Sequence, residues 1–318
     1  MDTGFPIPLI SAFRCIDDGS ALRLDRHSQL CENQRLVLEG ALLCDACCRA
    51  FPIDNGILNL LDADVMDEES QRELTIRNER ASKTARAKGP AWYDNDYGRA
   101  ELIPTLEALS AGLGKMVLEL GCGDGRYTLI LAEECSWVVA VDFSLESLRT
   151  LRQRLQNHQN IALVLSDITA LKVRSATFDR VFSTLVSNLP SRAHRDAMYH
   201  LAAVALKPEG RFVFSTHYHG LWQRLSGESQ SGRYKESGIY RYYFTLRECQ
   251  TEAKSFFALV TARTIQFHLP FAGRLGLPLV KISRMLESFP LFNKLGHLIL
   301  CIAEQPTKDG ASYKPDLL

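Results

Sequence analysis

The sequence predicts an α/β protein with a doubly wound sheet, parallel except for an antiparallel last strand, and a small β-rich module at the N-terminus. Two observations lead to this fold class. Between residues 116 and 216, apolar runs alternate with helix-forming segments of about 10–15 residues, which is the pattern of a parallel sheet covered on both faces. In contrast, five of the nine cysteines lie before residue 49, in short strand-like segments.

The composition of the chain indicates which binding partners and which cellular setting to expect. The chain has 318 residues, 46% of them hydrophobic, and 37 Lys+Arg balance 37 Asp+Glu. Nucleic-acid binders usually carry a positive excess, so the zero net charge argues against RNA or DNA. No apolar stretch reaches the roughly 18 residues that span a bilayer. The N-terminus lacks the features of a secretory signal, and the cysteines then predict a reducing, cytoplasmic setting.

Composition also changes along the chain, and these changes predict where one domain ends and the next begins. The Gly56 turn between apolar runs favours a β-module in the first segment. The following segment is charged and helix-favouring, and its charges are expected to form an exposed face. The expected parts are a small zinc-ribbon-like module at 1–63, a helical linker at 64–100, the main domain at 101–305 with an insertion or cap at 217–296, and a tail at 306–318.

The main domain begins with a helix that Gly112 and Gly114 end. Strands and helices then alternate, and the last two strands flank an apolar helical stretch. The expected helices of the alternating part are 126–135, 145–158 and 195–206. The expected strands are 116–121, 137–144, 161–168, 178–185, 211–217, 258–269 and 297–305.

A glycine-rich turn, V-L-E-L-G-C-G-D-G at 117–125, follows the first strand. Its glycines let the backbone approach a ligand just before a helix begins. Arg126 occupies the place of the third glycine of a dinucleotide motif, and no GK[ST] sequence follows, which excludes a P-loop. Asp142 ends the second strand, where a carboxylate can accept both hydroxyls of a ribose.

This turn matches E-x-G-x-G-x-G and resembles the first motif of the class I S-adenosylmethionine-dependent methyltransferases, which have a Rossmann-like fold. VVAVDFS (138–144), FDRVFSTLVSNLP (178–190) and LKPEGRFVFST (206–216) resemble later motifs of that family, in the family's order. The resemblance covers roughly residues 115–216. It implies S-adenosylmethionine as cofactor and methyl transfer as the reaction.

The resemblance also implies roles for single residues. Glu119 would help to fix the ammonium group of the cofactor, and Asp142 would bind the ribose. Asp167 would meet the adenine amino group while Ile168 packs against the ring. The other residues implied at the cofactor are Gly121, Cys122 and Gly123 of the turn, together with Tyr93, Phe143 and Thr184.

The methyl acceptor should meet residues that follow the fourth and fifth strands, because ligands bind at the carboxyl ends of such sheets. His217 is the preferred candidate for a catalytic base, since histidine has a suitable pKa. A structural hydrogen-bonding role is its alternative, and alignment alone can support methyl transfer without a base. The other candidates there are Thr184, Asn188, Tyr218 and His219.

Two further segments bear on the acceptor, which we expect to be small and apolar or aromatic. The segment 232–245 is rich in Tyr and Arg, and either faces the acceptor or covers the sheet as an amphipathic strand. The apolar stretch 269–300 could close over a hydrophobic acceptor, contact a membrane, form a dimer seam or add a core helix.

In the N-terminal segment, Cys44-x-x-Cys47 precedes AFPIDNGILNLL. This resembles the small zinc-binding module that is fused to, or partners, several methyltransferases. The resemblance implies that Cys15, Cys44 and Cys47 bind zinc in a closed tetrahedral site. Asp18 stands where the fourth cysteine is expected. The fourth ligand is then Asp18, His27 or Cys31, unless the module has lost its zinc.

Two rival functions remain beside a small-molecule methyltransferase. The N-terminal module also resembles that of a ribosomal RNA guanine methyltransferase, which suggests an RNA substrate. The zero net charge opposes this, as does STLVSN (183–188) in the place of an N-P-P-[YFW] motif. A non-catalytic binding subunit is the other rival, and the intact Glu119, Gly121, Gly123 and Asp142 argue against it.

Overall fold

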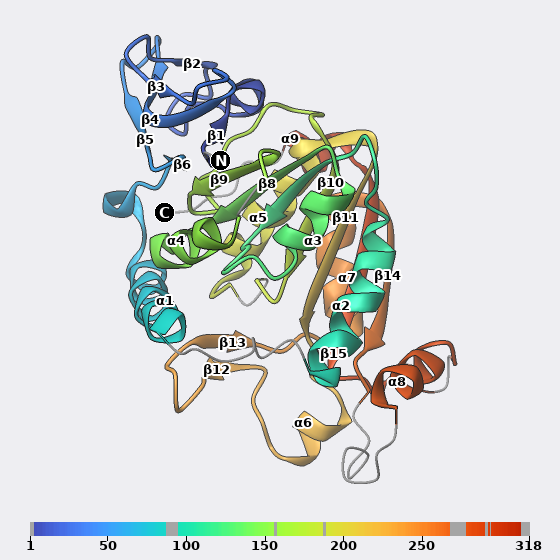
Figure 1. The fold of residues 1–318 in the computed structure, drawn as a ribbon. Helices are drawn as coiled ribbons and strands as arrows, with labels where there is room; N and C mark the ends of the chain where they lie inside the picture. The colour runs from blue at the N-terminus through green and yellow to red at the C-terminus, as the bar shows by residue number, and fades with distance from the viewer. Residues whose placement is uncertain are drawn as a thin grey trace.

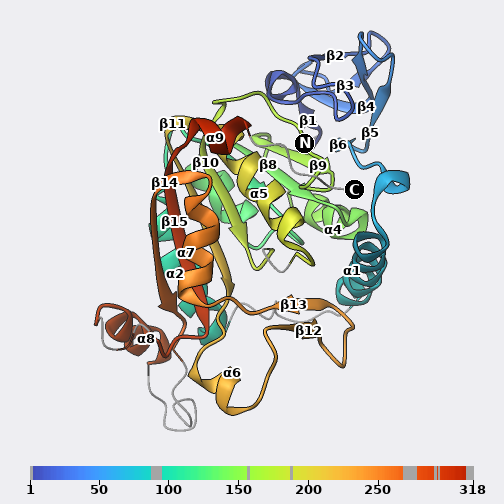
Figure 2. The same cartoon turned by 180° about the vertical axis from the view of Figure 1, so that it is seen from behind.

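The computed structural model describes residues 3–86, 95–155, 158–186, 189–267, 278–289, 292 and 294–312. One mixed sheet runs through the molecule in the order β1-β4-β5-β6-β9-β8-β7-β10-β11-β15-β14, with helices on both of its faces (Figures 1 and 2). A separate antiparallel pair, β12 (Ser231–Arg233) and β13 (Tyr240–Tyr242), lies beyond one end of the sheet.

The centre of the sheet is parallel. It contains β7 (Met116–Leu120), β8 (Trp137–Asp142), β9 (Ile161–Leu165), β10 (Phe178–Thr184) and β11 (Leu206–His217). β7, β8 and β9 are almost wholly apolar because both of their faces are covered. β15 (Leu298–Pro306), the last strand in the sequence, runs antiparallel between β11 and β14 (Phe257–Ile265), which confirms the predicted fold class.

The helices form two layers, each with its own apolar cluster. α2 (Asp96–Leu109), α3 (Thr128–Glu134) and α4 (Leu145–Arg154) pack on one face. α5 (Arg192–Ala205) and α7 (Leu246–Lys254) pack on the other. Serine or threonine side chains cap α4, α5 and α7 at their N-termini by accepting backbone N–H bonds, which fixes where each helix begins.

The N-terminal segment is joined to this sheet through backbone pairing. β6 (Ile57–Asn59) runs parallel to β9, and Leu60 N–H donates to the Leu165 carbonyl at 2.8 Å. The segment also shares the apolar cluster of the α5 face. The other elements of this segment are β1 (Phe5–Pro6), a 3-10 helix (Ile7–Ala12), β2 (Leu22–Leu24), β3 (Gln29–Leu30), β4 (Leu36–Cys44) and β5 (Ala50–Asp54).

The charged helix α1 (Glu68–Arg86) follows a short 3-10 turn (Ala63–Val65) and lies against α4. Ser144 Oγ donates to Asn78 Oδ1 at 2.7 Å. Glu73 is only 8% exposed, and it accepts hydrogen bonds from Arg233 and from the backbone of Tyr240. The expectation that the charges of this helix form only an exposed face is therefore wrong at Glu73.

The remaining described helices are short. They are α6 (Leu221–Leu225), α8 (Leu279–Glu287) and α9 (Lys308–Ser312). Within the stretch 269–300, residues 269–277, 290, 291 and 293 lie outside the described residues. Met285 of α8 is 56% exposed and Phe289 just beyond it is 50% exposed, so this part of the stretch is not simply a core helix. No helix in the described part of the chain combines the length and apolar character that crossing a bilayer requires.

Candidate active site and metal centre

The turn after β7 contains two glycines with positive φ, and their surroundings differ. Gly121 has φ of 74° and Gly123 has φ of 56°, a region that side-chain-bearing residues rarely adopt. A Cβ on Gly121 would lie 2.2 Å from Val186 Cγ2, so packing excludes a side chain there. A Cβ on Gly123 would meet no atom within 4 Å. The backbone at Gly123 therefore borders open space that a ligand could fill.

Glu119, near the end of β7, is only 2% exposed. Its Oε2 accepts a hydrogen bond of 2.6 Å from Thr128 Oγ1. Burial, with a smaller contribution from the negative charge of Asp142 and against the Thr128 hydrogen bond, raises the pKa of this carboxyl to about 8. The carboxyl is consequently mostly protonated at neutral pH, and an approaching cation would favour its ionised form.

Asp142 connects the turns after β7 and β8. Its Oδ2 accepts the N–H of Gly123 and its Oδ1 accepts the N–H of Ser144, both at 2.8 Å. Burial raises the pKa of this carboxyl, while these hydrogen bonds and the charge of Arg77 oppose the rise. Each carboxylate oxygen has a further lone pair, so the group can still accept bonds from two hydroxyls.

The other predicted cofactor residues lie around these two carboxylates or outside the described part. Ser166 N–H donates to the Asp142 carbonyl at 3.0 Å, which brings the turn after β9 alongside. Asp167 Oδ1 there accepts the N–H and Oγ1–H of Thr169, both at 2.8 Å. Ile168 and Cys122 are buried, whereas Phe143 and Thr184 are half-buried. Tyr93 and Asn188 lie outside the described residues.

His217 ends β11 beside aromatic side chains from the 232–245 segment. Its Nε2 lies 3.4 Å from Tyr234 Oη, and the Tyr243 ring packs edge-on with centroids 5.6 Å apart. Burial, together with the charges of Arg241 and Arg77, lowers the pKa of His217 to about 4. The imidazole is thus neutral at physiological pH, where it can accept a hydrogen bond but is a weaker base than an ordinary histidine.

The aromatic side chains of the 232–245 segment contact two different arginines. Tyr242 and Phe244 contact the guanidinium of Arg195, at 4.4 and 5.3 Å from their ring centroids, and so cover the α5 face of the sheet. Tyr243 and Tyr234 instead pack against Arg241, at 4.8 and 5.8 Å from its Cζ, on the side of His217.

The two residues after His217 in the sequence, Tyr218 and His219, make contacts with other parts of the chain. The His219 ring stacks on Tyr243, and His219 Nε2 lies 2.9 Å from the Glu228 carbonyl oxygen. Tyr218 is 7% exposed and its N–H donates to the His297 carbonyl. Sequence reasoning included Tyr234 in the segment 232–245 but missed Arg77 near this site. The i,i+4 spacing of Glu73 and Arg77 on a helix was the only signal for Arg77, and this spacing does not show which way the side chain points.

A second cluster lies in the N-terminal segment. One ligand atom from each of Cys15, Asp18, Cys44 and Cys47 lies within 4.8 Å of the others. The Sγ atoms of Cys15 and Cys47 are 3.5 Å apart, and Cys44 Sγ lies 3.4 Å from Asp18 Oδ2. Zinc bonds of about 2.3 Å to sulfur and about 2.0 Å to oxygen give tetrahedral edges of about 3.8 and 3.5 Å. The donor set therefore fits a zinc ion.

Two matched turns bring these donors together. Cys15 N–H donates to the Ser20 carbonyl and Cys44 N–H donates to the Arg49 carbonyl, both at 2.9 Å. The residue after the last donor has positive φ in each turn, 79° at Gly19 and 61° at Cys48. Asp18 thus occupies in the first turn the place that Cys47 occupies in the second.

The alternative fourth ligands are placed elsewhere. Cys31 Sγ donates to Asn33 Oδ1 at 2.7 Å and accepts the N–H of Leu36 at 3.2 Å, so it stabilises its own turn. His27 is exposed and does not belong to the cluster. Among the three candidates, the geometry favours Asp18.

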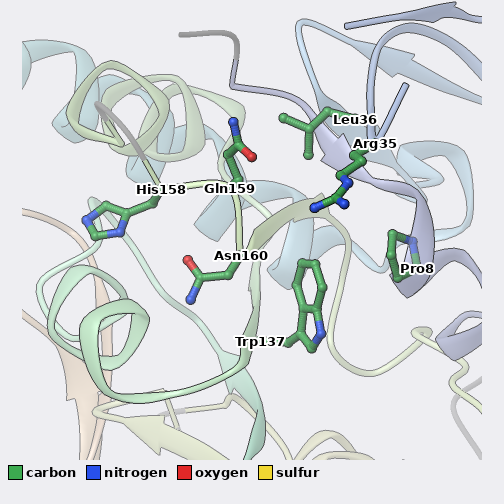
Figure 3. Close-up of a pocket in the computed structure, with 7 residues that line it drawn as sticks. All are labelled: Pro8, Arg35, Leu36, Trp137, His158, Gln159 and Asn160. Atoms are coloured by element: carbon green, nitrogen blue, oxygen red, sulfur yellow. The ribbon is translucent and has the colours of Figure 1, made fainter. Parts of the chain in front are cut away.

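A cavity of about 400 Å³ lies between the N-terminal segment and the sheet (Figure 3). Trp137 begins β8 and Asn160 directly precedes β9, so the cavity is at the amino ends of these strands. It is therefore at the opposite edge from Asp142 and His217. Its lining residues are Pro8, Arg35, Leu36, Trp137, His158, Gln159 and Asn160.

Comparisons with known proteins agree with this geometry. A family model described as "Methyltransferase domain" matches residues 117–210, which include the β7 turn, Asp142 and β10. The chain contains a methyltransferase domain at these residues. The methyltransferase domain is thus the part of the chain that carries the three strand-end carboxylates.

Curated relatives match parts of the chain. Phosphoethanolamine N-methyltransferase 1 of Triticum aestivum is 30% identical over 211 residues, which are 62% of this chain and 39% of that protein. Demethylmenaquinone methyltransferase of Mycobacterium sp. (strain KMS) is 35% identical over 115 residues, 35% of this chain and 47% of that protein. The match thus spans less than half the length of each relative.

Among solved structures, the N-methyltransferase NodS from Bradyrhizobium japonicum WM9, in complex with S-adenosyl-L-homocysteine, has a TM-score of 0.51. It is 17% identical, and the match covers 73% of this chain and 99% of NodS. At this identity the likeness concerns the fold, and it agrees with the Rossmann-like sheet described above.

Proposed function

We propose that this protein binds S-adenosylmethionine at the carboxyl ends of β7, β8 and β9 and transfers its methyl group to a small molecule beside His217. The observation that carries the proposal is the arrangement of Glu119, Asp142 and Asp167 at three adjacent strand ends, around the open space at Gly123. When bound, the cofactor supplies an activated methyl group.

The residues of the chain would then hold the two reactants. The buried carboxyl of Glu119 would bind the ammonium group of the cofactor, and Asp142 would accept the ribose hydroxyls. Asp167 would receive the adenine amino group. His217, neutral at physiological pH, would accept a hydrogen bond from the acceptor, and alignment of acceptor, methyl and sulfur would supply much of the rate.

A small-molecule acceptor is supported by the side chains near His217. Tyr234 and Tyr243 offer aromatic surface with a few polar atoms, as small-molecule sites commonly do. The neutral chain offers no general electrostatic attraction for RNA. We therefore favour an acceptor with an aromatic or apolar part over an RNA base.

The test combines binding and transfer. We expect S-adenosylhomocysteine to bind in calorimetry with micromolar-range affinity, and labelled methyl from S-adenosylmethionine to reach a small molecule in a screen of phenols, quinones, amines and lipid precursors. Filter binding of bulk RNA at low and moderate salt is the control, and we expect it to be weak. Tight, salt-dependent RNA binding with methyl incorporation would support the rival function, and no cofactor binding would refute the proposal.

A pH dependence follows from Glu119. Because the pKa of its carboxyl is about 8 in the free protein, binding of an ammonium group below that pH must release a proton. The Kd for S-adenosylhomocysteine should therefore fall as pH rises from about 6.5 to about 8.5. Calorimetry in buffers of different ionisation enthalpy measures both the affinity and the released proton.

Glu119→Gln should bind more weakly and lose this pH dependence. Glu133→Gln, an exposed neighbour on α3, is the matched control and should keep it. A wild-type Kd that stays constant over this pH range would contradict the role of Glu119.

We also infer that the Cys15, Asp18, Cys44 and Cys47 cluster binds zinc. Support comes from the spacing of the donors and from the two matched turns. The ion would stabilise the N-terminal segment and would have no part in methyl transfer, because all four positions of a tetrahedral site are filled by protein ligands.

A further inference from the structure

Arg77 lies on α1, on the stretch of the helix that faces the end of β8 and β13. Two neighbouring contacts fix this stretch of the helix. The next residue, Asn78, accepts the hydrogen bond from Ser144, just beyond Asp142, and Glu73 accepts the N–H of Tyr240 from β13 at 2.8 Å. α1 therefore connects the end of β8 with the segment around His217, as its position beside β12 and β13 also indicates (Figure 1).

The charge of Arg77 acts at both of these places. It opposes the rise that burial causes in the pKa of the Asp142 carboxyl, and it adds to the lowering that burial causes in the pKa of His217. The contacts of Asn78 and Glu73 place Arg77 between the end of β8 and the segment around His217. A ligand that bridges the cofactor and His217 would consequently pass close to Arg77.

Within the described part of the chain, the guanidinium of Arg77 has a hydrogen-bond donor without an acceptor. Its Nε is buried without a hydrogen-bond partner there. Glu73 Oε2 is 3.7 Å from Nε, and Oε1 of the same carboxylate already accepts hydrogen bonds from Arg233 and Tyr240. A guanidinium has five donors, and leaving them unpaired in a desolvated position is unfavourable.

The Arg77 side chain is nevertheless not fully enclosed. It keeps 38% of its surface exposed, although burial lowers its pKa. By comparison, Arg233 pairs with Glu69 and Glu73, and Arg241 pairs with Glu228 at 3.2 Å.

We propose that Arg77 binds an oxyanion of the methyl acceptor, a phosphate or a carboxylate, and so orients the accepting atom beside His217. The planar guanidinium matches such a group with two parallel hydrogen bonds. Tyr234 Oη, beside His217 Nε2, would supply a further donor to the same molecule. The proposal rests on the proposed function and adds the chemical class of the acceptor.

The cofactor carries a carboxylate of its own, so the experiment separates the two sources. Calorimetry first measures S-adenosylhomocysteine binding to wild type and to Arg77→Gln. The protein saturated with S-adenosylhomocysteine is then titrated with inorganic phosphate, phosphoethanolamine and malonate. Ethanolamine, which lacks the anion, serves as the chemical control, and Arg72→Gln, an exposed position on the same helix, serves as the matched variant.

We expect at least one of the three anions to bind wild type and to bind Arg77→Gln about tenfold more weakly or worse. Arg77→Lys should restore part of the affinity, and Arg72→Gln should behave like wild type. S-adenosylhomocysteine affinity should change by less than about threefold in Arg77→Gln.

Equal anion binding by wild type and Arg77→Gln would overturn the inference, as would binding of none of the anions to a wild type that binds S-adenosylhomocysteine. A loss of S-adenosylhomocysteine affinity as large as the loss of anion affinity would assign Arg77 to the cofactor carboxylate and would also overturn it. Failure of wild type to bind S-adenosylhomocysteine at all would refute the proposed function itself.

Discussion

Replacing Asp142 by alanine is expected to weaken S-adenosylhomocysteine binding by about a hundredfold or more. The variant loses two hydrogen bonds to the ribose, each contributing about 1.5–3 kcal/mol when the acceptor is charged. It also frees the N–H groups of Gly123 and Ser144, which the carboxylate holds at 2.8 Å in the turns after β7 and β8. Calorimetry of the purified variant measures the change.

Asp124→Asn is the matched control, because Asp124 lies in the same turn but pairs with Arg154 on the surface. Its affinity should stay within about threefold of wild type. Thermal unfolding with and without ligand shows whether the Asp142 variant remains folded. An Asp142→Ala protein that is folded and binds with wild-type affinity would contradict the assignment of the ribose site.

Removal of zinc is expected to have the largest effect on stability. Structural zinc sites contribute apparent free energies of about 10–16 kcal/mol in small modules. The N-terminal segment shares a sheet and an apolar cluster with the methyltransferase domain. Loss of the zinc should therefore lower the unfolding temperature of the whole protein. Elemental analysis should find about one zinc per chain, and a strong chelator should lower the unfolding temperature.

Single substitutions in the cluster separate its ligands from their neighbours. Cys44→Ser should lose the metal, whereas Cys48→Ser, at an exposed cysteine next to the cluster, should keep it. Asp18→Ala should bind zinc more weakly than His27→Ala, because Asp18 takes the fourth position in the geometry. A zinc content near zero, with unchanged unfolding of Cys44→Ser, would mean that the segment is metal-free.

The parallel core could be predicted from the sequence because its signals are local. Each strand of the βαβ units is an apolar run a few residues long, and each turn follows directly from it. The strand ends then place Glu119, Asp142 and Asp167 at one edge of the sheet without further information. The strand boundaries differ from the prediction by a few residues, as at 161–168, where β9 ends at Leu165.

The remaining features depend on contacts between distant segments. Nothing near Arg77 in the sequence indicates that its helix connects the end of β8 with β13. The fourth zinc ligand could not be chosen from spacing alone, because Asp18, His27 and Cys31 all precede Cys44. The comparison of two turns that favours Asp18 requires backbone hydrogen bonds and φ angles, which no residue pattern supplies.

The parallel pairing of β6 with β9 has a consequence for how the chain folds. Without β6, β9 would end the parallel part of the sheet with unpaired N–H and C=O groups, which readily recruit strands from other molecules. β6 covers that edge from within the chain. It is synthesised about a hundred residues before its partner strand, however, and pairing at such separation forms slowly. During synthesis, β6 therefore exposes an unpaired strand edge until β9 has been made. We expect the nascent chain to be most prone to aggregate in this interval.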